Sequence, residues 1–162
     1  MRAAVFTISD KGSRGERKDE SGPAVAALLE SAGISILVRA IIPDELSLIE
    51  EKLIECADHH HLDIVVTIGG TGVSPRDVTP DATRRVIERE LPGMAEAMRM
   101  ESFKKTPHAV ISRALCGIRG KTLIINLPGS PRGAVENLQI ILSAIPHAVE
   151  KIKGDPSDCA SS

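Results

Sequence analysis

A run of glycines directly follows the most apolar segment of the chain. Residues 62–68 read Leu-Asp-Ile-Val-Val-Thr-Ile, which predicts a buried strand, and Gly69-Gly70-Thr71-Gly72 comes next. Glycine allows positive φ angles and lets backbone N–H groups approach an anion closely. The run is not a Walker A loop, because no Gly-Lys-Ser/Thr follows, and it is not Gly-x-Gly-x-x-Gly. It favours a ligand-binding loop over an ordinary tight turn.

Acidic residues lie in loops and at helix starts near the predicted strand ends. Asp77 lies in the polar loop beside the glycines, which favours a functional role over a surface ion pair with Arg76. Asp44 follows Pro43 and precedes an amphipathic helix, so spacing alone favours an N-cap for it. Asp81 lies in the first turn of another helix, where the helix dipole favours a negative charge. The residues alone nominate Asp77 as functional and give structural roles to the other two aspartates.

Two hydroxyl-proline pairs mark predicted helix starts. Thr79-Pro80 and Ser130-Pro131 each place a hydroxyl at the N-cap and a proline at the first helical position. Around the second pair, residues 129–133 offer backbone N–H groups to an anion. Three arginines are candidate phosphate ligands, although a solvated surface position is the commoner fate of each: Arg113, Arg119 and Arg132.

Neither a metal cluster nor a nucleophile is evident from side-chain spacing. His59-His60-His61 are consecutive, so their side chains do not face one another on a helix, and we expect them to favour a helix C-terminus instead. There is no cysteine or carboxylate cluster at metal-ligand spacing. Cys116 has no histidine partner nearby in the sequence, which weakens a nucleophile interpretation.

Composition excludes several classes of protein. The 162 residues suit one domain, and a formal net charge of -2 argues against nucleic-acid binding by bulk charge. With no Trp, no Tyr and two Phe, a base-stacking platform is excluded. No apolar stretch approaches the roughly 20 residues of a membrane span, and the apolar start is too short for a signal peptide. Three cysteines, odd in number and far apart, indicate free thiols and a cytoplasmic protein.

Strand-like and helix-like segments alternate along the chain. Strands are predicted over 3–8, 34–42, 62–68 and 122–127. Helices are predicted over 23–33, 46–57, 79–90, 92–103 and 131–152, the last bent by Pro146. Residues 9–22 read as a polar loop, and 106–119 give no clear pattern.

This alternation predicts an α/β fold, with a doubly wound, mostly parallel sheet and helices on both faces. We expect a single domain over residues 1–154 and a disordered tail over 155–162. Ligands bind such folds at the carboxyl ends of the strands. Three loops meet that condition: 43–44, 69–72 and 128–129.

Taken together, the loop motifs resemble those of the MogA/MoaB-type molybdenum cofactor biosynthesis family. The resemblance is carried by Thr67-Ile-Gly-Gly-Thr-Gly72, Pro75-Arg-Asp-Val-Thr-Pro-Asp-Ala-Thr83 and Asn126-Leu-Pro-Gly-Ser-Pro131. Ile42-Pro-Asp-Glu45, Ser112-Arg113 and Gly117-Ile-Arg-Gly120 add to it. It extends over residues 1–154, is close to the gephyrin-type adenylyltransferase domains, and is specific as a combination of motifs.

The resemblance implies a molybdopterin adenylyltransferase, which transfers AMP from Mg-ATP to the terminal phosphate of molybdopterin and releases pyrophosphate. It implies delivery to a MoeA-like molybdotransferase and a homo-oligomer, a trimer in the MogA branch and often a hexamer in the MoaB branch. The family's two functional aspartates fall on Asp44 and Asp77, as catalytic residues and Mg2+ ligands. A pterin-site serine falls on Ser112. The implied substrate-binding set is completed by Gly69, Gly70, Thr71, Gly72, Ser74, Arg76, Pro128, Gly129 and Ser130.

The implied chemistry suits these residue types. A phosphate monoester is already ionised at pH 7, so its oxygen needs no general base, and transfer depends on positioning and charge neutralisation. Two aspartates then suit Mg2+ or ATP positioning. Two alternatives are a MoaB-type pterin carrier with weak or no catalysis and a generic nucleotide-binding regulatory domain. The presence of both Asp44 and Asp77 favours the enzyme.

Overall fold

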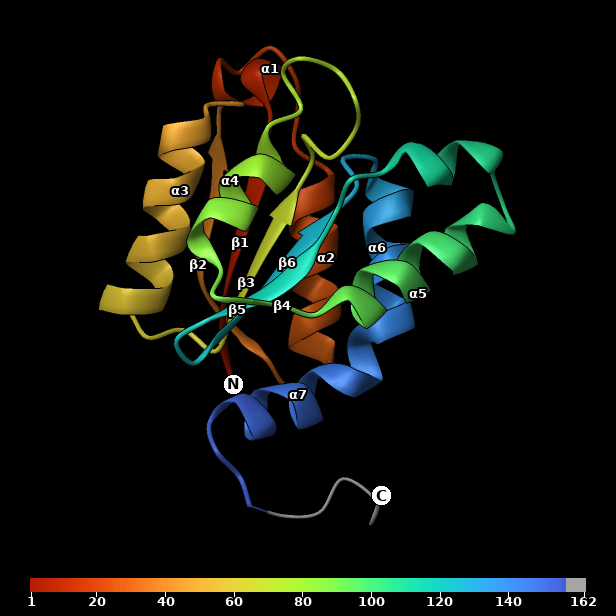
Figure 1. Ribbon diagram of the computed structural model, residues 1–162. Helices are drawn as coiled ribbons and strands as arrows, with labels where there is room; N and C mark the ends of the chain where they lie inside the picture. Colours follow the sequence, from red (N-terminus) through yellow and green to blue (C-terminus); the bar gives the residue numbers. More distant parts are fainter. Residues whose placement is uncertain (157–162) are drawn as a thin grey trace.

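A six-stranded sheet runs through the centre of the computed structural model, which describes residues 1–156 (Figure 1). The strands are β1 Arg2–Ile8, β2 Ser35–Ile42, β3 Ile64–Ile68, β4 Arg89–Glu90, β5 Cys116–Arg119 and β6 Thr122–Leu127. The α-helices are α1 Asp10–Ser13, α2 Ser21–Ser31, α3 Leu46–Ile54, α4 Thr79–Val86, α5 Pro92–Phe103, α6 Pro131–Ile141 and α7 Ile145–Ile152. A π-helical turn, η1 Glu55–His59, and two 3-10 turns, η2 Pro107–Ile111 and η3 Leu142–Ala144, complete the elements.

The strand order across the sheet is β2-β1-β3-β6-β5-β4. Four neighbouring strands, β2, β1, β3 and β6, run parallel, whereas β5 pairs antiparallel with both β6 and β4. The chain leaves β1 toward β2 and then crosses to the other side of β1 to form β3. The predicted α/β fold with a mostly parallel sheet is confirmed, and the reversal between β1 and β3 is a topological switch point.

Alternating side chains of the strands build two separate cores. Ala3 and Val5 of β1 face one core, whereas Ala4 and Phe6 face the other. Helices α2, α5, α6 and α7 cover the first face, and α3 and α4 cover the second (Figure 1). Both faces of the central strands are therefore buried, which is why the sequences of these strands are continuous apolar runs.

The predicted helix over 79–90 is too long. Helix α4 ends at Val86, and Ile87 is already extended, with φ -75° and ψ 148°. Beyond it, Glu88 N donates to Ile118 O and Leu91 N donates to Cys116 O, both at 2.8 Å, so this segment becomes the edge of the sheet. Pairing with a strand distant in sequence overrides the local helical pattern.

Other boundaries differ from the sequence predictions in instructive ways. The long predicted helix divides into α6 and α7 at a 3-10 turn, and Pro146 lies in the first turn of α7, where its missing N–H costs no hydrogen bond. The polar loop contains the short helix α1, capped by the Ser9 hydroxyl, which accepts from Gly12 N at 3.0 Å. Of the predicted tail, residues 157–162 lie outside the described residues.

A buried polar network ties α4 to the sheet. The Asn126 side-chain amide of β6 donates to the hydroxyls of Thr67 and Thr83, each at 2.9 Å, and its oxygen accepts from Leu115 N at 3.3 Å. Thr83 in turn donates to the carbonyl oxygen of Thr79 at 2.9 Å. Because buried polar groups are costly when unpaired, this chain of bonds fixes the first turn of α4 over β3 and β6.

No helix within residues 1–156 has the length and apolar content needed to cross a bilayer.

Candidate functional site

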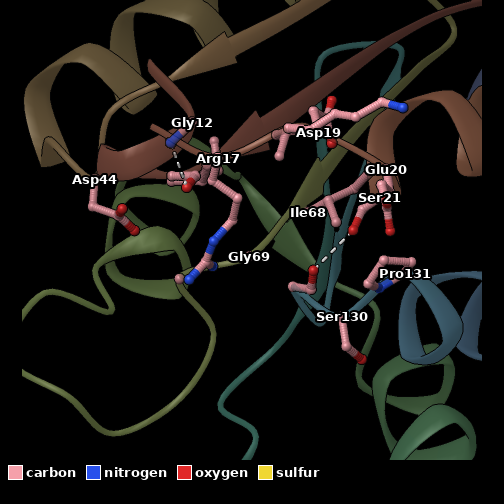
Figure 2. Close-up of a pocket in the computed structure, with 16 residues that line it drawn as sticks. Gly12, Arg17, Asp19, Glu20, Ser21, Asp44, Ile68, Gly69, Ser130 and Pro131 are labelled. Atoms are coloured by element: carbon pink, nitrogen blue, oxygen red, sulfur yellow. Dashed lines mark hydrogen bonds between the residues drawn. The ribbon is translucent and has the colours of Figure 1, made fainter. Parts of the chain in front are cut away.

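The candidate functional residues gather where the parallel strands end. A pocket of about 720 Å³, hereafter the first pocket, opens at the switch point between β1 and β3 (Figure 2). Its walls come from the ends of both strands, from the segment between β1 and α2, from Asp44, and from residues 129–131. This is the place at which an open α/β sheet binds ligands.

Two strand ends approach here more closely than side chains would allow. Gly69 has φ +106°, and a Cβ there would lie 2.5 Å from Ile8 O at the end of β1. On the opposite side, a Cβ at Gly129 would lie 3.3 Å from the Gly69 Cα. Glycine at these positions therefore brings the ends of β1, β3 and β6 together around the first pocket.

Gly70 meets the same restriction for a different reason. Its φ is +60°, and a Cβ there would overlap the Thr79 hydroxyl and lie 3.0 Å from Asp44 Oδ1. The Gly70 backbone also accepts a hydrogen bond from Thr79 N at 3.1 Å. The glycine loop, residues 69–72, thus packs between the start of α4 and the Asp44 carboxylate.

Asp44 follows β2 and does not cap the next helix, so the capping interpretation is wrong. Glu45 occupies the N-cap of α3 and makes no side-chain cap bond. Asp44 Oδ2 instead accepts from Asp10 N at 2.8 Å, and Asp10 Oδ1 accepts from Asp44 N at 3.1 Å. Burial raises the pKa of Asp44, and the nearby charges of Asp10 and Asp77 raise it further. The carboxylate therefore lies in a negative environment that a cation would relieve.

Asp77 lies in the loop that joins the glycines to α4. Its Oδ2 accepts from Ser74 N at 2.7 Å and would lie 2.8 Å from a Cβ at Gly72. Arg113 holds this loop: its guanidinium donates to Gly72 O at 2.7 Å and to Asp77 O, and it pairs with Asp81 at 2.9 Å. The helix-dipole position of Asp81 is thus reinforced by an ion pair, and Arg113 positions the loop that carries Asp77.

Arg76 does not pair with Asp77. Its guanidinium binds Asp10 through bonds of 2.9 to 3.1 Å and also contacts Glu45 at 3.1 Å. The Arg76 hydrogen bonds hold the pKa of Asp10 below its usual value and raise that of Arg76.

A second pocket, of about 280 Å³, lies between α5, η2 and α6. Three basic side chains line it: Arg99, Lys105 and His108. Ser112 lies at its wall, directly after η2, and its hydroxyl accepts from Ala114 N at 3.4 Å.

Most of the predicted site residues divide between the two pockets, whereas Ser74, Arg76 and Asp77 line neither. The first is lined by Asp44, Gly69, Gly70 and Gly129, and the second by Thr71, Gly72, Ser112 and Pro128. Ser130 lines both, and its hydroxyl caps α6 as predicted by accepting from Gly133 N at 3.2 Å. By contrast, Thr79 is not the cap of α4, since Val78 occupies that position.

Several residues of the first pocket were missed by the sequence analysis. Arg17 and Lys18 line it, and Figure 2 shows the Arg17 side chain extending toward Gly69. Ser21, at the start of α2, donates to Gly129 O at 2.9 Å. A signal was available, because residues 9–22 follow a parallel strand and must emerge at the same edge as the glycine run.

The donor set suits a cation that is shared with a ligand. Within residues 1–156, no group of three or more His, Cys, Asp or Glu side chains could hold a metal ion, so the three consecutive histidines form no metal site among these residues. Asp44 and Asp77 are close enough for the charge of Asp77 to raise the pKa of Asp44. Mg2+ is commonly bound by one or two carboxylates together with substrate phosphates, and these residues fit that arrangement.

The remaining candidates have structural roles. Arg119 pairs with Asp58 at 2.6 Å, and Arg132 pairs with Glu136 at 2.8 Å. Burial raises the pKa of Cys116 to about 12, so its thiol is not an activated nucleophile.

Gly70→Ala tests the close packing of Gly70 against Thr79 and Asp44. We expect it to lower the free energy of unfolding by about 1–3 kcal/mol, because the new methyl group meets the Thr79 hydroxyl and Asp44. Gly93→Ala in α5 is the matched control, since nothing lies within 4 Å of its Cβ position, and it should stabilise by about 0.4–1 kcal/mol. Urea denaturation measures both, and equal stability of Gly70→Ala and the unchanged protein would contradict the close approach.

Comparison with known proteins gives a consistent result. Residues 4–147 match the family described as "Probable molybdopterin binding domain". The molybdopterin adenylyltransferase of Helicobacter pylori strain J99 is 44% identical over 153 residues, covering 93% of this chain and 87% of its own. The molybdenum cofactor synthesis protein cinnamon of Drosophila melanogaster is also 44% identical, over 154 residues, and the chain spans 26% of that longer relative.

Solved structures extend the similarity to the fold. The molybdopterin biosynthesis enzyme MoaB of Thermus thermophilus is 45% identical, with a TM-score of 0.90 over 97% of this chain and 99% of that one. A MogA structure is 37% identical, with a TM-score of 0.89 over 94% of this chain and 99% of that one. The chain is a member of the MogA/MoaB family of molybdenum cofactor biosynthesis proteins.

Proposed function

We propose that this protein is a molybdopterin adenylyltransferase, which transfers AMP from Mg-ATP to the terminal phosphate of molybdopterin and releases pyrophosphate. The observation that carries the proposal is the meeting of two pockets suited to anions at Ser130 and the glycine run, beside two aspartates. A relative that carries the name of this activity is 44% identical over most of both chains.

The first pocket suits the nucleotide. The N-termini of α2 and α6 both reach it, at Ser21 and at Pro131, and helix N-termini favour phosphate groups. Arg17 and Lys18 contribute positive charge at its wall, beside the carboxylates of Asp19 and Glu20. The adenine would pack on aliphatic side chains and backbone, because the pocket lining contains no aromatic residue.

The second pocket suits the phosphorylated pterin. Arg99 and Lys105 line it, with Lys105 paired to Glu136 at 3.0 Å, and cationic side chains favour a phosphate monoester. Asn137 also lines it, and a side-chain amide supplies both donors and an acceptor for the polar edge of a pterin. Ser112 then contacts the pterin substrate rather than the nucleotide.

The reaction needs positioning more than proton transfer. An ionised oxygen of the pterin phosphate attacks the α-phosphorus of ATP, the bond from that phosphorus to the bridging oxygen breaks, and pyrophosphate leaves with the bonding electrons. Mg2+, held by Asp44 and Asp77, would offset the charge of the triphosphate. Ser130 and the glycine run hold the two anions next to each other, which converts a collision into a local reaction.

A second candidate is a pterin carrier with weak or no catalysis. The structural match to a MoaB, with a TM-score of 0.90 and 45% identity, is the observation that favours it. The carrier requires only the second pocket, whereas the enzyme requires both. We further propose a cytoplasmic location, since the two described cysteines, Cys56 and Cys116, are buried free thiols. On the family resemblance alone, we propose that the product is handed to a MoeA-like molybdotransferase.

The deciding experiment incubates the protein with molybdopterin and Mg-ATP and follows adenylyl-molybdopterin and pyrophosphate. The enzyme forms both products in equal amounts, and EDTA stops the reaction. Binding of molybdopterin without either product would establish the carrier in place of the enzyme. Failure to bind molybdopterin or ATP would reject both.

Asp77→Asn should slow turnover by about 100-fold or more while leaving pterin binding intact. The reason is that the carboxylate proposed to hold Mg2+ or to position ATP loses its negative charge. Asp58→Asn is the control, as Asp58 pairs with Arg119 and lines neither of the two pockets. Steady-state assays measure both. Near-normal turnover in Asp77→Asn would remove this carboxylate from the mechanism.

The two pockets should be separable by mutation. Ser112→Ala, in the second pocket, should weaken molybdopterin binding more than ATP binding, and Asp77→Asn should do the reverse. Calorimetric titration of each ligand into each variant gives the comparison. If both variants weakened the same ligand by similar amounts, a single shared site would replace the two.

The protein should also self-associate, as a trimer by our proposal. Four apolar side chains of α5 and the adjoining turn η2 are each more than half exposed: Met100, Phe103, Val110 and Ile111. Phe103→Asp should therefore dissociate the assembly in analytical ultracentrifugation. Leu37→Asp, an exposed site on β2, should leave it intact. A monomer at micromolar concentration, before any substitution, would contradict the proposal.

A further inference from the structure

One hydroxyl beside the site has no partner. Thr79 Oγ1 is the only buried side-chain nitrogen or oxygen within residues 1–156 that makes no hydrogen bond. Thr79 itself is 0% exposed, so water does not reach the group. A buried hydroxyl without a partner is destabilising, and such a group calls for an acceptor.

The surroundings of Thr79 leave its hydroxyl directed at one neighbour. Its N–H donates to Gly70 O at 3.1 Å, and its carbonyl accepts from Thr83 at 2.9 Å, so the backbone is held on both sides. The hydroxyl oxygen lies against the position where Gly70 lacks a Cβ. Asp44 Oδ1 lies 3.0 Å from that same position.

Asp44 offers a matching acceptor. Its Oδ2 is engaged by Asp10 N at 2.8 Å, whereas Oδ1 accepts no hydrogen bond from any residue of the described chain. Asp44 lies in a loop between β2 and α3, where its side chain has room to turn, since it lines the first pocket. Thr79 Oγ1 and Asp44 Oδ1 therefore both face the space that Gly70 leaves open by lacking a Cβ, and the hydrogen bond between them requires the Asp44 side chain to turn.

We propose that Thr79 is a positioning residue whose hydroxyl donates a hydrogen bond to Asp44 Oδ1 and fixes the orientation of this carboxylate toward the first pocket. The buried network from Asn126 through Thr83 to Thr79 then ends at the site rather than at an unused hydroxyl. The side chain thus links the sheet core to the carboxylate. The part of the inference that concerns nucleotide binding rests on the proposed function.

A double-mutant cycle tests the bond without any ligand. Thr79→Val removes the hydroxyl and keeps the shape, and it should lower the melting temperature of the unchanged protein because Asp44 loses a donor. In the Asp44→Ala background the same change should be neutral or raise the melting temperature, because the hydroxyl there has no acceptor. The same shift in both backgrounds would overturn the proposal.

Thr122→Val is the matched control for the cycle. Thr122 is buried to a similar extent and donates to Leu62 O at 2.6 Å, beside the opposite ends of the strands. Its substitution should lower the melting temperature equally in the unchanged and Asp44→Ala backgrounds. Unequal shifts for this control would mean that Asp44→Ala perturbs the whole fold, and the coupling at Thr79 would then be rejected as evidence.

Calorimetry of Mg-ATP binding supplies the functional readout. Thr79→Val should bind Mg-ATP about ten-fold more weakly, the effect of losing one hydrogen bond to a charged group, whereas Thr79→Ser should bind as the unchanged protein does. Equal binding by Thr79→Val and the unchanged protein would overturn the inference alone. Absence of Mg-ATP binding in the unchanged protein would overturn the proposed function, and the ligand-free cycle would still decide the hydrogen bond.

Discussion

Close contact between strand ends that are occupied by glycines, which carry no Cβ, governs the geometry of this site. Gly69 directly follows β3, and a Cβ there would lie 2.5 Å from the carbonyl oxygen of Ile8. Gly129, beyond the end of β6, packs against the Cα of Gly69. A side chain at Gly69 would force the ends of β1 and β3 apart, whereas one at Gly129 would require only a small shift of Gly69. Both pockets are lined by Ser130, which directly follows Gly129, so this close approach sets how the two pockets lie relative to each other.

The charged side chains around this contact orient the loops and leave the carboxylates of Asp44 and Asp77 outside the ion pairs. The guanidinium of Arg76 binds Asp10 and Glu45, and that of Arg113 binds Asp81 and two loop carbonyls. These pairs are exposed, so each adds little to stability, but they orient loops that have few buried contacts. The carboxylates of Asp44 and Asp77 accept hydrogen bonds from the backbone N–H groups of Asp10 and Ser74 and from no cationic side chain within residues 1–156.

Sequence periodicity predicted the central strands and most helices, because the apolar faces that it reports are the ones buried. The strand at 122–127 and the helix at 92–103 agree with the structure at both ends. The end of α4 could not be predicted, since the pairing of Glu88 with Ile118 involves residues distant in sequence. The partners of Arg76 could not be predicted either, because they lie at the starts of α1 and α3, which only the sheet topology brings together.

Residue type and family motifs nominated the glycine run and both aspartates as candidate site residues, whereas they did not nominate Arg17 and Lys18, which line the first pocket. The difference has a physical origin. Glycines and aspartates at strand ends are conspicuous because a strand interior disfavours them. A basic residue in a polar loop looks like any solvated side chain until the fold closes the loop over a pocket. Only the switch point between β1 and β3 distinguishes that loop from the others, so topology must be assigned before such residues can be recognised.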